Sequence, residues 1–141
     1  MKKILIFSVS VLLLSSFLWI PSSNDSGIKF QDITFNQAIA KAKKEKKFIF
    51  MNVYAVWCAP CTNLKKTTFQ SDKIGNTFNN NFVNISIDAE KGEGIELSRK
   101  YEVVAHPLML VINPDGKVEK RILGYVNEGQ LLKEVKGYLK K

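Results

Sequence analysis

From residue 30 onward, apolar residues recur at two spacings, one typical of helices and one typical of strands. Phe35, Ala38 and Ala42 follow the helical spacing, and Thr34 with Gln37 three positions later is a capping-box helix start. Other short stretches are continuously apolar or strictly alternating, as buried and half-buried strands are. The pattern predicts, in order, a helix over 34–46, a strand over 48–54, a helix over 61–69, a short helix from 71 or 72, a strand over 82–88, a helix over 95–101, strands over 108–112 and 118–123, and a final helix that buries Leu132, Val135 and Leu139.

This alternation of helices and strands predicts an α/β fold, in which helices cover both faces of one sheet. Residues 113–116, Asn-Pro-Asp-Gly, are a strong turn signal, so the two strands that flank them are expected to form a hairpin. The sequence contains no internal repeat. We therefore expect one domain over residues 30–141.

The first 20 residues differ in character from the rest of the chain. Lys2 and Lys3 precede an apolar run over 4–20, and a polar stretch follows it. This layout predicts a signal peptide or signal anchor over 1–20 and a linker over 21–29, with the domain exported. No clean small-x-small cleavage site follows the run, and its length is near the lower limit for a membrane span. Cleavage and tethering to the inner membrane through residues 4–20 both remain open, with the domain outside that membrane.

The composition excludes several classes of protein. Hydrophobic residues make up 45% and charged residues 24%, which is ordinary for a globular domain and argues against disorder. Two cysteines and one histidine are too few for a disulfide-rich scaffold, a four-cysteine zinc site or a three-histidine metal centre, so we expect no metal. The net charge is +8, but only two basic residues are Arg. We expect solvated helix faces or attraction to anionic lipid, and no nucleic-acid binding.

The candidate chemistry lies in the sequence Trp57-Cys58-Ala59-Pro60-Cys61, between a predicted strand and a predicted helix. Cys58 is expected at the exposed first helical turn, where free N–H groups and the helix dipole favour a thiolate. Cys61 follows one turn later, shielded and close enough to resolve a mixed disulfide on Cys58. A purely structural disulfide over so short a loop would stabilise little, and half a zinc ribbon would need a second cysteine pair. The pattern therefore predicts thiol–disulfide exchange.

Over residues 30–141 the chain resembles the thioredoxin superfamily. The resemblance rests on WCAPC at 57–61, the tyrosine-to-proline stretch at 101–107, Gly124, Gly129-Gln130-Leu131, TFQSDK at 68–73 and NPDGK at 113–117. TFQSDK and NPDGK are most similar to exported thioredoxin-like proteins, which include the periplasmic C-terminal reductase domain of a transmembrane electron carrier. The resemblance implies a thioredoxin fold with a central mixed sheet, protein-disulfide oxidoreductase activity, and no cofactor beyond a redox-active Cys58–Cys61 disulfide.

The resemblance also implies a substrate-binding groove. Pro107 would have a cis peptide bond, lie against the cysteine pair and order the substrate chain as a strand. Trp57, Ala59, Pro60 and His106 would shape the groove around it. Without the resemblance, an ordinary trans proline at a strand start would be the expectation.

Two asparagines depart from the family pattern at positions that would modulate the cysteine pKa values. Asn52 stands where members have a buried Asp that is thought to help deprotonate the resolving thiol. When the next strand is aligned on Asp88, Asn84 occupies the position of the Lys that accompanies the buried Asp in family members. An amide cannot take a proton, so Cys61 would need water or another group as its base.

The third departure is His106, which precedes Pro107 where the family often has a small or β-branched residue. As a cation it would favour the Cys58 thiolate, and as a neutral base it could carry the proton of Cys61. As an inert group it would pack beside Trp57. All three interpretations remain open.

Taken together, the residues and the resemblance predict a monomeric protein-disulfide reductase outside the inner membrane, with protein thiols and disulfides as substrates. A reductase in an oxidising compartment needs electrons from a membrane partner, which would be a separate protein. A disulfide oxidase or isomerase that uses the same site is one alternative. A non-catalytic module that holds a peptide in the thioredoxin groove is the other.

Overall fold

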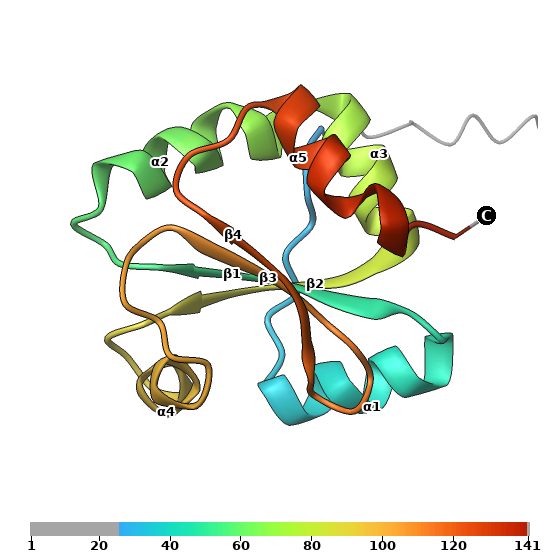
Figure 1. The fold of residues 1–141 in the computed structure, drawn as a ribbon, viewed down its shortest axis with the longest axis horizontal. Helices are drawn as coiled ribbons and strands as arrows, with labels where there is room; N and C mark the ends of the chain where they lie inside the picture. The colour runs from blue at the N-terminus through green and yellow to red at the C-terminus, as the bar shows by residue number, and fades with distance from the viewer. Residues whose placement is uncertain (1–25, 141) are drawn as a thin grey trace, which may run out of the picture.

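Four strands and five α-helices follow one another in residues 26–140, the part of the chain that this computed structural model describes (Figure 1). They are α1 (Phe35–Glu45), β1 (Phe48–Tyr54), α2 (Ala59–Lys66), α3 (Asp72–Asn81), β2 (Phe82–Asp88), α4 (Glu93–Lys100), β3 (Leu108–Ile112), β4 (Val118–Leu123) and α5 (Glu128–Val135). Two 3₁₀ turns, η1 (Thr68–Gln70) and η2 (Lys136–Tyr138), complete the order. The predicted order of elements is confirmed.

The strands form one mixed sheet in the order β2-β1-β3-β4. β1 pairs in parallel with β2, so that Asn52 lies opposite Ser86, and it pairs antiparallel with β3. The parallel pair requires a crossover, which α2 and α3 supply, whereas β3 and β4 form the hairpin predicted from the turn signal. The amide oxygen of Asn113 accepts hydrogen bonds from the backbone of Asp115 and Lys117, both at 3.0 Å, and closes that turn.

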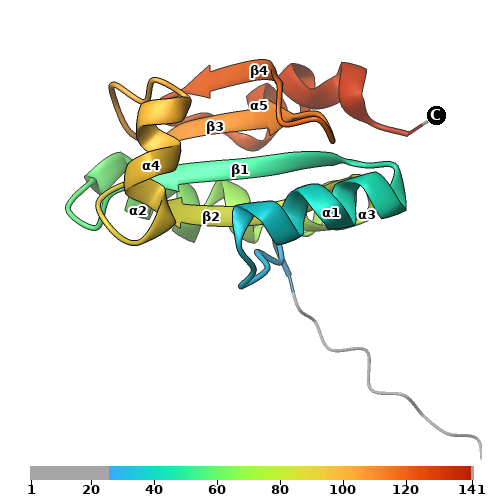
Figure 2. The same cartoon turned by 90° about the horizontal axis from the view of Figure 1, so that it is seen from below.

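Helices cover both faces of the sheet, as predicted (Figures 1 and 2). α1 and α4 pack on one face, and α2, α3 and α5 pack on the other. Alternation along β1 divides its side chains between the two cores: Met51 faces α1 and α4, and Phe50 faces the other three helices. The ring of Phe50 lies 4.6 Å from that of Phe78, centroid to centroid, in an edge-to-face contact.

The helix predicted over 61–69 is interrupted. Its α-helical part ends at Lys66, and Thr67 leaves the helical region with φ −117° and ψ −86°. A threonine hydroxyl that bonds to the carbonyl four residues earlier can bend a helix, and Thr67 makes such a bond. Thr67 donates to the carbonyl oxygen of Asn63 at 2.8 Å, and Thr68 donates to that of Val126 at 2.7 Å.

The final helix also differs from its prediction. It begins after Asn127, which forms a capping box with Gln130 that the apolar pattern did not reveal. Its fully buried residues are Leu131 and Val135, whereas Leu132 is only partly buried. Leu139 packs on the same core from beyond the helix end.

The packed part of the chain begins before residue 30. Gly27 has φ +94° and lies against Gly75 of α3 so closely that a Cβ on either glycine would collide with backbone atoms. The amide of Asn79 donates to the Gly27 carbonyl at 3.1 Å, and the backbone N–H of Gln31 donates to the Asn84 carbonyl at 2.9 Å. Residues 27–31 are thereby fixed along β2 and α3.

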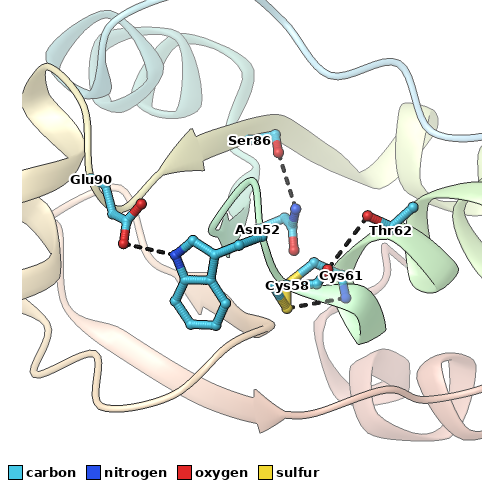
Figure 3. The surroundings of a disulfide bond; sticks show 7 residues. Asn52, Cys58, Cys61, Thr62, Ser86 and Glu90 are labelled. Carbon is cyan, nitrogen blue, oxygen red and sulfur yellow. Dashed lines mark hydrogen bonds between the residues drawn. A yellow bond between two sulfur atoms is a disulfide. The ribbon is translucent and has the colours of Figure 1, made fainter.

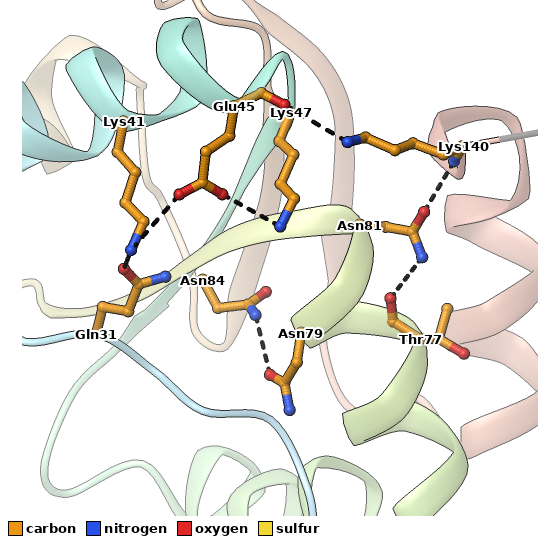
Figure 4. A network of polar contacts seen from close by, with 9 residues as sticks. All are labelled: Gln31, Lys41, Glu45, Lys47, Thr77, Asn79, Asn81, Asn84 and Lys140. Atoms are coloured by element: carbon orange, nitrogen blue, oxygen red, sulfur yellow. Dashed lines mark hydrogen bonds and ion pairs between the residues drawn. The ribbon is translucent and has the colours of Figure 1, made fainter.

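The lysine-rich end of α1 is a solvated face. Lys41 and Lys47 flank Glu45 with Nζ–Oε distances of 3.8 and 3.2 Å (Figure 4). Such surface ion pairs contribute about 0–1 kcal/mol each. Within residues 26–140, no helix is long and apolar enough to cross a membrane. The predicted signal or anchor over 1–20 lies outside the described residues.

Candidate functional site

The cysteine pair lies where β1 ends and α2 begins. Cys58 is the N-cap of α2, and its Sγ accepts a hydrogen bond from the Cys61 backbone N–H at 3.2 Å (Figure 3). The two residues form a disulfide with a Cα–Cα distance of 5.3 Å. Pro60 occupies the first turn, where a missing N–H costs nothing. In the reduced state this same N–H and the helix dipole would favour a negative sulfur on Cys58.

The expected contrast between an exposed Cys58 and a shielded Cys61 is wrong. Cys58 is 4% exposed and Cys61 is 8% exposed. Both side chains pack against Ala55, because the N-cap geometry turns the Cys58 sulfur inward toward the helix. The exposed parts of the motif are Trp57, at 68%, and the residues between the cysteines. The indole ring is therefore accessible at the surface beside a disulfide that is itself buried.

Trp57 connects two loops beside the disulfide. Its indole N–H donates to the Glu90 carboxylate at 2.9 Å (Figure 3). Its ring meets that of His106 edge to face, with centroids 6.1 Å apart. His106 is half-buried, and its Nδ1 is buried with no hydrogen-bond partner in residues 26–140. Of the three interpretations of His106, packing beside Trp57 is therefore observed.

Pro107 has the cis peptide bond that the resemblance implied. The residue is buried, and its carbonyl oxygen accepts a hydrogen bond from the Gly124 N–H at 2.8 Å. That bond joins the start of β3 to the end of β4.

The partner of Asn52 is Ser86 rather than Asn84. Asn52 is 7% exposed, and its Nδ2 donates to Ser86 Oγ at 3.0 Å. Figure 3 shows the amide oxygen on the side of the cysteine pair, and within residues 26–140 this buried oxygen has no hydrogen-bond partner. Asn84 lies opposite Phe50 in the sheet, and its amide donates to Asn79 at 3.3 Å (Figure 4). Its contacts therefore tie β2 to α3 and do not involve Asn52.

A cavity of about 460 Å³ lies behind Cys61. It is lined by Phe30, Asn52, Tyr54, Ala55, Val56, Cys61, Thr62, Lys65, Phe69 and Ser86. Three residues at this site were not predicted from the sequence: Ser86, Lys65 and, across the disulfide, Glu90. Helical spacing could have found Lys65, which lies four residues after Cys61, whereas Ser86 required the strand register. Within residues 26–140, no group of three or more His, Cys, Asp or Glu residues is placed to hold a metal ion.

Comparisons with known proteins give matches to a thioredoxin-like family model and to thiol:disulfide interchange proteins. A family model described as thioredoxin-like domain matches residues 35–138. The thiol:disulfide interchange protein DsbD of Pseudomonas fluorescens is 28% identical over 98 residues, which are 67% of this chain and 17% of that protein. DsbD of Vibrio cholerae is 30% identical over 99 residues, or 67% of this chain and 16% of that protein. The chain thus spans less than a fifth of these relatives.

Solved structures agree with the family model. The solution structure of a "putative disulphide-isomerase" from Bacteroides thetaiotaomicron is 41% identical, with a TM-score of 0.71, over 79% of this chain and 92% of that one. The oxidised C-terminal domain of DsbD from Neisseria meningitidis is 20% identical, with a TM-score of 0.62, over 73% of this chain and 90% of that one. At that identity the second likeness shows the fold alone.

Proposed function

Because the chain belongs to the thioredoxin-like family, we propose that it works as a protein-disulfide reductase outside the inner membrane. It is a protein-disulfide oxidoreductase with a Cys58–Cys61 disulfide of the CxxC type. We propose, in addition, the direction of electron flow, the compartment and the roles of the individual residues.

The proposed reaction is a two-step exchange. The Cys58 thiolate attacks one sulfur of a substrate disulfide, which forms a mixed disulfide and releases the first substrate thiolate to take up a proton. The Cys61 thiolate then attacks Cys58 Sγ, so that the Cys58–Cys61 bond forms, the mixed disulfide breaks and the second substrate thiolate leaves. Two electrons pass from the cysteine pair to the substrate, and a donor must then reduce the pair again.

One observation supports the reductase direction, and two others support a membrane partner and export. Ala59 and Pro60 provide no side-chain hydrogen-bond donor to Cys58, so the thiolate is stabilised mainly by the Cys61 N–H and the helix dipole. Weak stabilisation of the thiolate leaves the reduced pair a good electron donor. The similarity to DsbD of two organisms supports an exchange partner in a membrane, and the apolar run over 4–20 supports export or tethering.

The substrate groove is proposed around the exposed indole of Trp57. Ala59 and Pro60, which are exposed, would form the rim between the cysteines, and His106, whose ring contacts Trp57, would form the opposite wall with Pro107. We infer that an extended substrate chain pairs with the backbone beside Pro107. The chain would act as a monomer on protein disulfides, with no bound cofactor.

A disulfide isomerase is the second candidate, because the Bacteroides relative with that description is 41% identical. The equilibrium potential of the cysteine pair in a glutathione buffer, measured on the full chain, separates the two. We expect a value near the thioredoxin end, about −270 mV. A value of about −180 mV would favour the isomerase, and a value of about −120 mV would favour an oxidase. A Cys58→Ser variant that keeps its cellular role would instead support the non-catalytic peptide-binding module.

A further inference from the structure

The second step of the exchange needs a negatively charged sulfur on Cys61, and none of the described residues that line the cavity beside it is an Asp or Glu that could take its proton. The nearest buried polar group on β1, Asn52, is an amide whose nitrogen is engaged by Ser86. An amide and a hydroxyl cannot serve as a base at neutral pH. Stabilisation of the Cys61 thiolate must therefore come from a positive charge or from water in the cavity.

The charged and titratable groups around the cysteine pair come from four directions. They are Tyr54 on β1, Asp88 and Glu90 at and after the end of β2, Lys65 on α2, and His106 before β3. Glu90 is bound to the Trp57 indole, and Asp88 is paired with Lys91 at 3.7 Å. His106 lies on the Trp57 side of the disulfide. Of the described residues that line the cavity, only Lys65 is a basic residue, and none is acidic.

Lys65 is placed to act on Cys61 rather than on a carboxylate. The two residues are four positions apart on α2, so their side chains lie on one face of the helix, and both line the same cavity. Within residues 26–140, Lys65 has no ion-pair partner. Its neighbour Lys66 is also exposed, but it does not line the cavity.

We propose that Lys65 is a positioning charge for thiol–disulfide exchange: its ammonium group stabilises the Cys61 thiolate across the cavity, in place of proton removal by a buried base. In the mixed disulfide, the Cys61 thiol releases its proton to cavity water, and the thiolate stays paired with Lys65 until it attacks Cys58 Sγ. The new disulfide is neutral, so Lys65 is left without its anion after each turnover. The proposal rests on thiol–disulfide exchange at this site but not on its direction, so a potential that refutes the reductase would leave it intact.

The test isolates Cys61 in a Cys58→Ser background, where serine keeps the helix N-cap. The full chain in a nonionic detergent is alkylated with iodoacetamide from pH 5 to 10, and the rate reports the thiolate fraction. Three variants are compared in this background: Lys65→Gln, Lys65→Arg, and Lys66→Gln as the matched control.

We expect Lys65→Gln to lower the alkylation rate at pH 7 about fivefold and to move the midpoint of the pH profile upward, as loss of one partly screened charge would. Lys65→Arg should keep the parent profile, and Lys66→Gln should change it less than about twofold. The fivefold difference should shrink in 0.5 M NaCl, because salt screens exposed charges. Equal profiles for Lys65→Gln and Lys66→Gln, or a loss that Lys65→Arg does not restore, would overturn the proposal.

Discussion

Replacement of Asn52 by Asp tests how dry the site behind the disulfide is. The substitution is nearly isosteric, so the fold should be kept. At low pH a protonated Asp can donate to Ser86 Oγ as the amide does now, over a distance that is 3.0 Å in the present structure. At higher pH the same group becomes a carboxylate in a position that is only 7% exposed. The difference in stability between the variant and the parent protein should therefore depend on pH.

The size of the effect follows from burial. Desolvation raises the pKa of a buried carboxyl by up to 3–5 units, and here the Ser86 hydroxyl and the Lys65 ammonium offset part of that rise. A net rise of about 2 units, from about 4 in the unfolded chain to about 6, corresponds to about 3 kcal/mol. Because the folded pKa is the higher one, the folded state holds the proton longer, and stability falls as the pH rises from about 4 to about 6. Above that range the loss stays constant.

Urea unfolding of the oxidised protein measures the difference, since the disulfide removes the cysteines from the titration. We expect Asn52→Asp and the parent to differ by less than about 1 kcal/mol at pH 4 and by about 3 kcal/mol at pH 8. Asn63→Asp, on the exposed side of α2, is the control and should show no such dependence. An Asn52→Asp deficit that is the same at pH 4 and pH 8 would refute the reasoning, because the carboxylate would then be as well solvated as in the unfolded chain.

Two further predictions concern the packing that holds the site. Gly94→Ala should destabilise the domain by about 1–3 kcal/mol in thermal unfolding, because its Cβ would collide with the Asp88 carbonyl. Gly129→Ala, in an open helical position, should stabilise it by about 0.5–1 kcal/mol, and a loss at both sites would contradict this account. Phe50→Ala should lower the free energy of unfolding in urea by about 3–5 kcal/mol, because Phe50 is fully buried among other rings. As a control, Val104→Ala, at a residue that is 91% exposed, should change it by less than about 0.5 kcal/mol.

The elements of the fold could be predicted from the sequence because their signals are local. The capping box of Thr34 with Gln37 and the turn at 113–116 depend on hydrogen bonds within a few residues, and both form as predicted. The break after Lys66 could not be predicted in this way. Thr68, in the 3₁₀ turn that follows the break, donates its hydroxyl to a carbonyl 58 residues away, a contact that no local pattern reveals.

The same distinction separates the parts of the site. The cysteine pair and its helix start could be found from five consecutive residues. The residue beside Asn52 depends on the register of β1 with β2. The sequence alignment placed Asn84 beside Asn52, whereas the register places Ser86 there. The burial of Cys58 was missed for a related reason, since exposure depends on which way the N-cap side chain turns and not on its position in the motif.

The two edge strands of the sheet, β2 and β4, determine whether strands of other proteins can add to it. Along β2, the outer backbone of Asn84 is already engaged by Gln31, and along β4 the charged residues Glu119, Lys120 and Arg121 follow one another. Open strand edges invite further strands to add, and a covered edge or a charged one discourages this. Under the proposed function, the domain would meet partly folded protein substrates, whose extended segments could add to an open edge. If substrates pair beside Pro107 as proposed, the covered β2 edge and the charged β4 strand would keep further strands from adding elsewhere on the sheet.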